Sequence, residues 1–251
     1  MENIFDCLTC CLNISVGKSA FLTAEGIELC LIMLRDGKLS CPRALRLLDH
    51  ALAGTGQESA ACCAKLVEAA GLKPTFTLLM KKHDSQMTEH LLGILSSMLR
   101  SLPADSAERI RLLAKFVEKD YEKLTRLVQI RRDYASRVTL VDQTIASERA
   151  ALSDAEAEDQ ADEFLSRRLD AGLFSLQTVD VILAWLVAED SGARAKIKSL
   201  LAERDEGFAD LQRTLREQME GMEARVWEDG EEEEKDGVVK EMLGTLVGCL
   251  E

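Results

Sequence analysis

The sequence predicts an all-α protein. Leucine occurs 39 times, against 23 isoleucines and valines together, and this balance favours helices over strands. Only three prolines and 15 glycines occur in 251 residues, so few positions interrupt a helix. Because 47% of the residues are hydrophobic, a chain of this length can bury a substantial core. General disorder is therefore excluded.

A weak internal repeat gives the architecture. The segment F-L-T-A-E-G-I-E-L-C-L-I-M-L-R from Phe21 aligns with L-V-E-A-A-G-L-K-P-T-F-T-L-L-M from Leu66, a shift of 45 residues. A third copy starts at Phe116, after a shift of 50 residues, with Asp120 and Tyr121 in place of the pair that ends in glycine. Such a period indicates stacked helical repeats.

Each of the first two copies predicts a short helix, a break at Gly26 or Gly71, a second helix, a loop and a third helix. Glycine at the break avoids the strain of a Cβ atom in a sharp turn. The third helices are expected from Pro42 and over Thr88–Leu102, where leucines recur at helical spacing. Three helices per repeat of this length are the armadillo arrangement, a right-handed superhelix. We assign it to residues 1–135.

The chain is expected to begin within a repeat. Residues Met1–Ile14 resemble a third helix whose own first two helices are missing. Beyond Arg132 the repeat is lost, and helices are expected over Tyr134–Leu152, Phe164–Ala188 and Ala193–Arg225, followed by a last helix at the carboxyl end. Residues 136–251 are predicted to form a C-terminal helical cap, which covers the end of the superhelix and presents a polar outer face to solvent.

Acidic residues gather in two segments. The formal charge of the chain is 31 − 44 = −13. Residues 154–163 hold six acids and no base, and residues 217–236 hold ten acids against Arg225 and Lys235. The run E-D-G-E-E-E-E-K-D-G at 228–237 predicts a mobile loop, because like charges repel. The loop is either a solvated spacer or a docking site for a basic peptide.

Two classes of ligand are disfavoured. A surplus of acid disfavours general binding of nucleic acid, and the basic stretch Arg109–Arg137 lacks a series of stacking aromatic residues. We expect its charges on the outer face of a long helix, with an apolar inner face formed by Leu113, Phe116, Leu124, Leu127 and Ile130. No apolar run approaches the length of a membrane span.

No cofactor, metal or catalytic group is predicted. Cys7-x-x-Cys10 lacks a second pair of zinc ligands. The segment S-V-G-K-S from Ser15 resembles the end of a phosphate loop, but Leu12 stands where its first glycine belongs. We expect the cysteines to pack as small core residues in a non-secreted protein, namely Cys7, Cys10, Cys11, Cys30, Cys62 and Cys63. An all-α enzyme with an unrecognised site between repeats is the alternative from a different class.

The third helices of armadillo repeats line a concave groove, and this predicts a binding site for an extended basic peptide. Carboxylates there would pair with lysine or arginine, and polar side chains would hold the peptide backbone. The candidate contacts are Asn3, Asp6, Asp49, His50 and Glu89. Asp49 and His50 are adjacent on a helix and do not face each other, so they either mark the groove or satisfy a neighbouring repeat.

Self-association is expected at the amino-terminal end of the stack. The incomplete first repeat would expose an apolar face around Ile4, Phe5, Leu8 and Leu12. Exposed apolar faces of this kind favour association.

The sequence resembles the C-terminal half of the beta-catenin-like protein 1 family. The resemblance rests on M-E-N-I-F-D-C-L from Met1, on the E-G-I-E-L block from Glu25, on A-L-R-L-L-D-H-A from Ala44 and above all on R-R-L-D-A-G-L-F-S-L-Q from Arg167. It implies a non-enzymatic armadillo-type scaffold of the nucleus, associated with the spliceosome through the nineteen complex. It also implies binding of nuclear-localisation-type basic segments of splicing factors. An importin-like or catenin-like adaptor for another cargo is the alternative.

Overall fold

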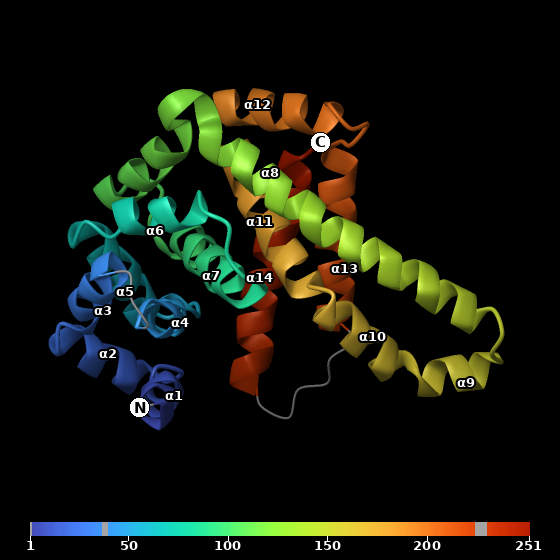
Figure 1. Cartoon of the computed structure of the whole chain (residues 1–251), viewed down its shortest axis with the longest axis horizontal. Helices are drawn as coiled ribbons and strands as arrows, with labels where there is room; N and C mark the ends of the chain where they lie inside the picture. Colours follow the sequence, from blue (N-terminus) through green and yellow to red (C-terminus); the bar gives the residue numbers. More distant parts are fainter. Residues whose placement is uncertain (1, 37–39, 224–229) are drawn as a thin grey trace.

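A computed structural model describes residues 2–36, 40–223 and 230–251 of the chain. Every regular element in these ranges is a helix. The all-α, armadillo-like fold class is therefore confirmed. Figure 1 shows the amino-terminal helices as a stack, from which α8 leads to a projecting arm and to the carboxyl-terminal helices.

The helices have the following bounds: α1 Glu2–Cys11, α2 Ser15–Thr23, α3 Gly26–Asp36, α4 Cys41–Leu52, α5 Gln57–Glu68, α6 Leu72–Leu79, α7 Ser85–Ser101, α8 Ala107–Arg149, α9 Asp154–Asp159, α10 Ala161–Asp170, α11 Leu173–Glu189, α12 Ser191–Ala202, α13 Phe208–Glu223 and α14 Gly230–Cys249.

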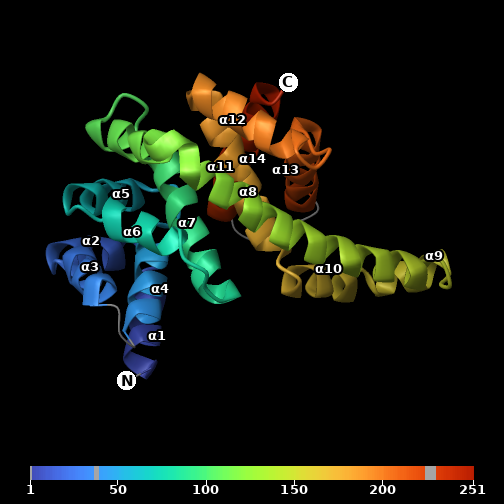
Figure 2. The same cartoon turned by 45° about the horizontal axis from the view of Figure 1, so that its top comes forward.

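The two predicted repeats are confirmed as α2–α3–α4 and α5–α6–α7. Their third helices, α4 and α7, pack side by side, and α1 packs on α4 as a third helix should (Figure 2). The core between them is apolar and closed, since leucines of α4 and α7 such as Leu45, Leu48, Leu91 and Leu95 are fully buried. The result is a row of third helices.

The glycines at the helix breaks have a different role from the one predicted. The left-handed residue at each break precedes the glycine, with φ of 55° at Glu25 and 59° at Ala70. A Cβ atom on Gly26 would overlap the ring of Phe21, and one on Gly71 would lie 2.7 Å from the carbonyl oxygen of Leu66. These glycines therefore permit close packing of the two helices, which a Cβ would block.

The third repeat is present but interrupted. Helix α8 breaks at Glu118–Tyr121, where Lys119, Asp120 and Tyr121 all have positive φ, as the alignment at Asp120 predicts. Helix α11 packs beside α7 in the next place of the row, so the row of third helices continues beyond Arg132. Another left-handed break, at Asp205 with φ of 57°, separates α12 from α13.

An inserted arm explains why the repeat disappears from the sequence. The second part of α8 runs out from the stack and returns through α9 and α10 (Figure 1), so the third helix of this repeat follows only at α11. Ion pairs join the two sides of the arm, from Arg167 to Glu148 at 2.5 Å and from Arg168 to Asp142 at 2.8 Å. The division at residue 135 falls within α8 and stays a prediction.

Several predicted helix limits are wrong. The helix expected over Phe164–Ala188 is divided into α10 and α11 at Gly172, whose φ is 100°. The helix expected over Ala193–Arg225 is divided into α12 and α13. The acidic segment 228–237 is not a loop where it is described, since 230–237 belong to α14; residues 228 and 229 lie outside the described ranges.

Some predicted surface charges are buried. Phe116, Leu124, Leu127 and Ile130 are buried as expected and Leu113 is half-buried, but Arg109, Lys123 and Arg131 are buried too. The outer-face prediction is therefore wrong for these three cations. Each of them faces a carboxylate or a carbonyl group from another part of the chain or from the break in α8, which compensates their loss of hydration.

The cysteine prediction is right for half of its residues. Cys30, Cys62 and Cys63 are buried, and burial raises the pKa of the Cys30 thiol to about 12. Cys7, Cys10 and Cys11 are exposed on α1, so the prediction is wrong for these three. Among the described residues no group of three or more metal-ligating side chains is close enough to hold an ion.

None of the described helices is by itself long and apolar enough to cross a bilayer. Two bent pairs reach the required length and composition only when joined, at bends of 114° and 64°.

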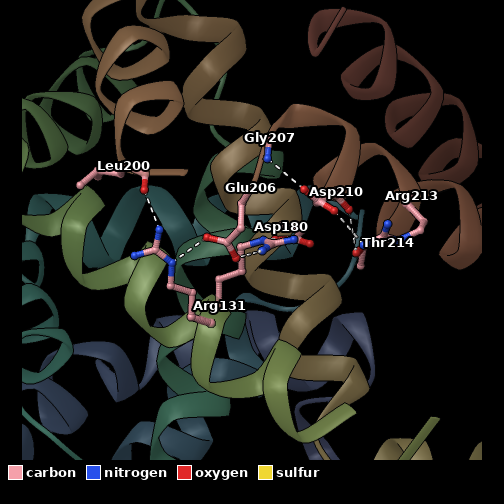
Figure 3. A network of polar contacts seen from close by, with 9 residues as sticks. Arg131, Asp180, Leu200, Glu206, Gly207, Asp210, Arg213 and Thr214 are labelled. Carbon is pink, nitrogen blue, oxygen red and sulfur yellow. Dashed lines mark hydrogen bonds and ion pairs between the residues drawn. The ribbon is translucent and has the colours of Figure 1, made fainter. Parts of the chain in front are cut away.

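A buried polar network attaches α11 and the α12–α13 connection to α8 (Figure 3). The Arg131 guanidinium donates to Asp180 at 2.8 Å and to Glu206 at 3.0 Å. Arg132 donates to the other oxygen of Glu206 at 2.7 Å and to the carbonyl of Leu200 at 2.6 Å. Burial raises the pKa of Asp180 to about 6, although the charge of Arg131 opposes this shift.

We predict that Gly172→Ala destabilises the protein by about 2–4 kcal/mol. Alanine is strained in the left-handed backbone conformation of this position, and its side chain would overpack the site. The new Cβ would overlap the ring of Tyr134 on α8. Urea unfolding followed by circular dichroism measures the change. The control is Gly221→Ala, where a Cβ has open space and stability should rise by roughly 0.5–1 kcal/mol. A loss at Gly172 no larger than the change at Gly221 would contradict the prediction.

We also predict that Asp180 makes stability depend on pH. Its folded-state pKa lies above the ordinary value of 3.8, so the protonated group favours the folded state. This contribution is complete below about pH 4 and is lost as the pH rises through about 6. The advantage of the natural protein over Asp180→Asn in unfolding free energy should therefore shrink by about 2 kcal/mol between pH 4 and pH 7. The exposed Asp162→Asn is the control, and a difference for Asp180→Asn that is independent of pH would refute the assignment.

Candidate peptide-binding groove

A groove of about 440 Å³ crosses the three neighbouring third helices α1, α4 and α7. We call it the third-helix groove. Its apolar surface comes from Phe5, Pro42 and Met87, and its polar surface from charged and amide side chains of the same helices. The described residues that line it are Phe5, Asp6, Pro42, Arg43, Arg46, Asp84, Gln86, Met87 and His90.

Asp6 is the one predicted contact that lines this groove. Its carboxylate accepts a hydrogen bond from Arg46 at 2.8 Å, and both side chains are well exposed. An exposed pair of this kind contributes little to stability, so the carboxylate can exchange its partner. Beside it, the guanidinium of Arg43 lies 5.9 Å from the centre of the Phe5 ring.

Asp49 joins two third helices. Its Oδ2 lies 2.9 Å from Nδ1 of His90 on α7, and its side chain is largely shielded from solvent. A Cβ atom on Gly93 of α7 would overlap the same carboxylate, so glycine is needed for α7 to approach α4. Asp49 therefore supports the groove wall through His90.

His50 contacts the opposite neighbour. Its Nδ1 lies 3.1 Å from Oδ1 of Asn13, in the connection between α1 and α2. Burial lowers the pKa of His50, which favours the neutral ring. As their spacing predicts, Asp49 and His50 point in different directions, and together they connect α4 with the helices on both sides.

Asn3 and Glu89 lie outside the groove lining. Both side chains are exposed, on α1 and α7 respectively, and neither is among the described residues that line the hollow. The structure thus brings Asp6 together with His90, the partner of Asp49, in the groove lining. Asn3 and Glu89 lie on the same helices, α1 and α7, but outside that lining. Their role in binding stays a prediction.

Sequence reasoning missed the basic side of the groove. Arg43 and Arg46 of α4 line the groove and recur at helical spacing, a pattern that was available in the sequence. Asp84 was also missed because its role as the amino-terminal cap of α7, accepting from the Met87 amide at 2.8 Å, conceals its place in the groove.

The phosphate-loop resemblance has a structural explanation. Lys18 of S-V-G-K-S is buried, and its ammonium group donates to Ser59 Oγ at 2.8 Å and to the carbonyl oxygen of Ala53. Burial lowers the pKa of this lysine. Lys18 thus ties α2 to the connection between α4 and α5.

Comparison with known proteins agrees with this architecture. The chain is 35% identical over 255 residues to the beta-catenin-like protein 1 homolog of Schizosaccharomyces pombe, which covers 100% of the chain and 44% of that protein. It is 34% identical over 260 residues to beta-catenin-like protein 1 of Homo sapiens, covering 98% of the chain and 45% of that protein. The chain thus spans less than half the length of these relatives.

The chain also matches a protein family over most of its length. Residues 1–216 match the family described as "Catenin-beta-like, Arm-motif containing nuclear", which covers the stack, the arm and most of the carboxyl-terminal helices. Together with the row of third helices, this match shows that the chain belongs to the catenin-beta-like, Arm-motif containing nuclear family.

Proposed function

We propose that this chain is a non-enzymatic scaffold of the nucleus that binds basic segments of splicing factors in pre-mRNA splicing. Components of the nineteen complex are the expected partners. The family description is nuclear, and the names of the relatives indicate an armadillo-type protein rather than an enzyme. The observation that carries the proposal is the third-helix groove, which places exchangeable carboxylates beside apolar surface.

The groove offers both parts of a lysine or arginine side chain a suitable environment. The aliphatic stem would lie on Phe5 and Met87, and the charged head would reach Asp6 or Asp84. Arg46 competes for Asp6, because it already occupies that carboxylate. A basic peptide must therefore displace an internal cation, which predicts modest affinity that falls with increasing salt.

We predict opposite effects for two changes in the groove. Asp6→Lys should weaken binding of a labelled nuclear-localisation-type peptide, because it replaces attraction by repulsion. Arg46→Gln should strengthen it, because it frees Asp6. Each effect should be roughly twofold to fivefold, as expected for exposed charge pairs. Fluorescence anisotropy at low and physiological salt measures both.

The matched controls change the same charges elsewhere. Asp162→Lys on α10 and Arg216→Gln on α13 are exposed positions outside the groove lining and should leave the affinity unchanged. If the groove variants and the controls shift affinity equally, the peptide responds only to net charge. If Asp6→Lys has no effect while its circular dichroism spectrum is native, basic segments do not bind in this groove.

We also propose self-association through the outer face of the first repeat. Leu12 is buried and Phe5 is half-buried, but Ile4 and Leu8 are exposed, as are Val16 and Ile32 on α2 and α3. Val16 is 77% exposed and Ile32 is 60% exposed. Apolar side chains exposed in this number on α1, α2 and α3 favour association.

We predict that the apparent molar mass from light scattering rises with protein concentration. Val16→Asp combined with Ile32→Asp should suppress the rise. Leu140→Asp on the arm, at a side chain 66% exposed, is the control and should not. A constant monomer mass across the concentration series would contradict self-association.

A further inference from the structure

A second groove lies at the amino-terminal end of α4. It has a volume of about 630 Å³ and lies between the carboxyl end of α3, the first turn of α4, α6 and the connection to α7. Leu34, Pro74, Leu78 and Met87 contribute its apolar surface. We call it the cationic groove, after the Arg35, Lys73 and Lys81 side chains in its lining.

The charges around this groove are all positive. Arg35, Lys73 and Lys81 line it, and no aspartate or glutamate is among its described lining residues. Lys73 and Lys81 are exposed, and neither makes an ion pair with any residue in the described ranges. In a chain of net charge −13, such a concentration of unpaired cations marks a local reversal of charge.

The positive surface continues along the amino-terminal end of α7. His83 lines the cationic groove and also an adjacent hollow of about 260 Å³, together with Lys82, Arg126 and Arg137. Arg126 donates to the carbonyl oxygens of Leu79 at 3.1 Å and Lys81 at 2.9 Å. These carbonyl groups position the guanidinium without neutralising it. Asp133 is the carboxylate among the described lining residues of this hollow.

We infer that the cationic groove binds an acidic protein segment that places an aliphatic side chain between Lys73 and Lys81. Carboxylates complement the cationic rim, and the apolar surface of Leu34 and Leu78 suits an aliphatic anchor rather than a further charge. The described lining residues include no Phe, Tyr or Trp, so the groove lacks the stacking platform that single-stranded nucleic acid requires. This inference is independent of the proposed binding of basic segments.

The two grooves adjoin each other. Pro42 and Met87 line both of them, so a surface with exchangeable carboxylates meets a surface with unpaired cations at the amino-terminal end of α4. Two partners of opposite charge would therefore bind to neighbouring surfaces. Their binding sites are distinguishable by the sign of the probe.

The test uses fluorescence anisotropy with a labelled peptide of glutamates carrying leucine at every fourth position. Binding should weaken with rising salt. Lys73→Glu combined with Lys81→Glu should weaken it roughly tenfold, since two exposed attractions become repulsions. Lys198→Glu combined with Arg216→Glu changes the net charge equally at exposed positions on α12 and α13. This control pair should leave the affinity within about twofold of the natural protein.

A second comparison tests the apolar part. The peptide with serine in place of leucine should lose most of its affinity. Thr77→Trp, at an exposed position in the groove lining, should fill the groove and weaken the leucine peptide while keeping every charge. Thermal unfolding of each variant confirms that it folds.

Three outcomes would overturn the inference. The first is equal weakening by the two charge-reversed pairs, which reduces the effect to net charge. The second is equal binding of the leucine and serine peptides, or no binding of either. The third is a uridine oligonucleotide that binds more tightly than the leucine peptide and is sensitive to the same lysines, which would make the groove a nucleic-acid site.

Discussion

The buried guanidinium of Arg109 joins the stack to the helices that follow it. It is 1% exposed and donates to the carbonyl oxygens of Met98 and Leu99 in the last turns of α7, and to the carboxylate of Glu189 at the end of α11. The ring of Trp185 lies 5.1 Å from it. Arginine suits this position because its donors can satisfy helix-terminal carbonyls and a carboxylate at once.

The arrangement of the carboxyl-terminal half follows from this contact. Since Arg109 holds the carboxyl ends of α7 and α11 together, the two helices run parallel, and α11 extends the row of third helices beyond the arm. Arg131 then joins α11 to the α12–α13 connection through Asp180 and Glu206. Breaking a buried pair of this kind leaves an uncompensated charge, so both arginines specify the packing as well as stabilise it.

Local patterns predicted much of the stack because the residues that contact each other within a repeat are close in sequence. The spacing of leucines in α4 and α7, the prolines and the paired breaks all act within one repeat. The arm was missed because the residues of α8, α9 and α10 separate α11 from the earlier third helices in sequence. The hydrophobic periodicity of α11 does not indicate which helix it packs against. Glycine identity located the breaks at Gly26 and Gly71 but suggested the wrong cause.

The candidate site divides in the same way. Helical spacing placed Asp6, Asp49 and His50 on third helices, and it correctly separated the directions of the last two. It could not predict that Arg46 would occupy Asp6 or that His90 would hold Asp49, because these partners come from neighbouring repeats. Likewise, Arg109 and Arg131 look like surface charges in a helical pattern, and only their distant carboxylates explain their burial.

The arm formed by the second part of α8, α9 and α10 has a consequence for how the chain can vary. Its two sides pair with one another, as Arg167 does with Glu148. Arg168 of α10 also pairs with Glu217 of α13, and Gly172, where the arm returns, packs closely against Tyr134. Residues could be added or removed beyond that anchor without moving α7 or α11. The arm is therefore a length-tolerant segment set between two rigid units, and changes in its reach would leave the spacing of the third helices intact.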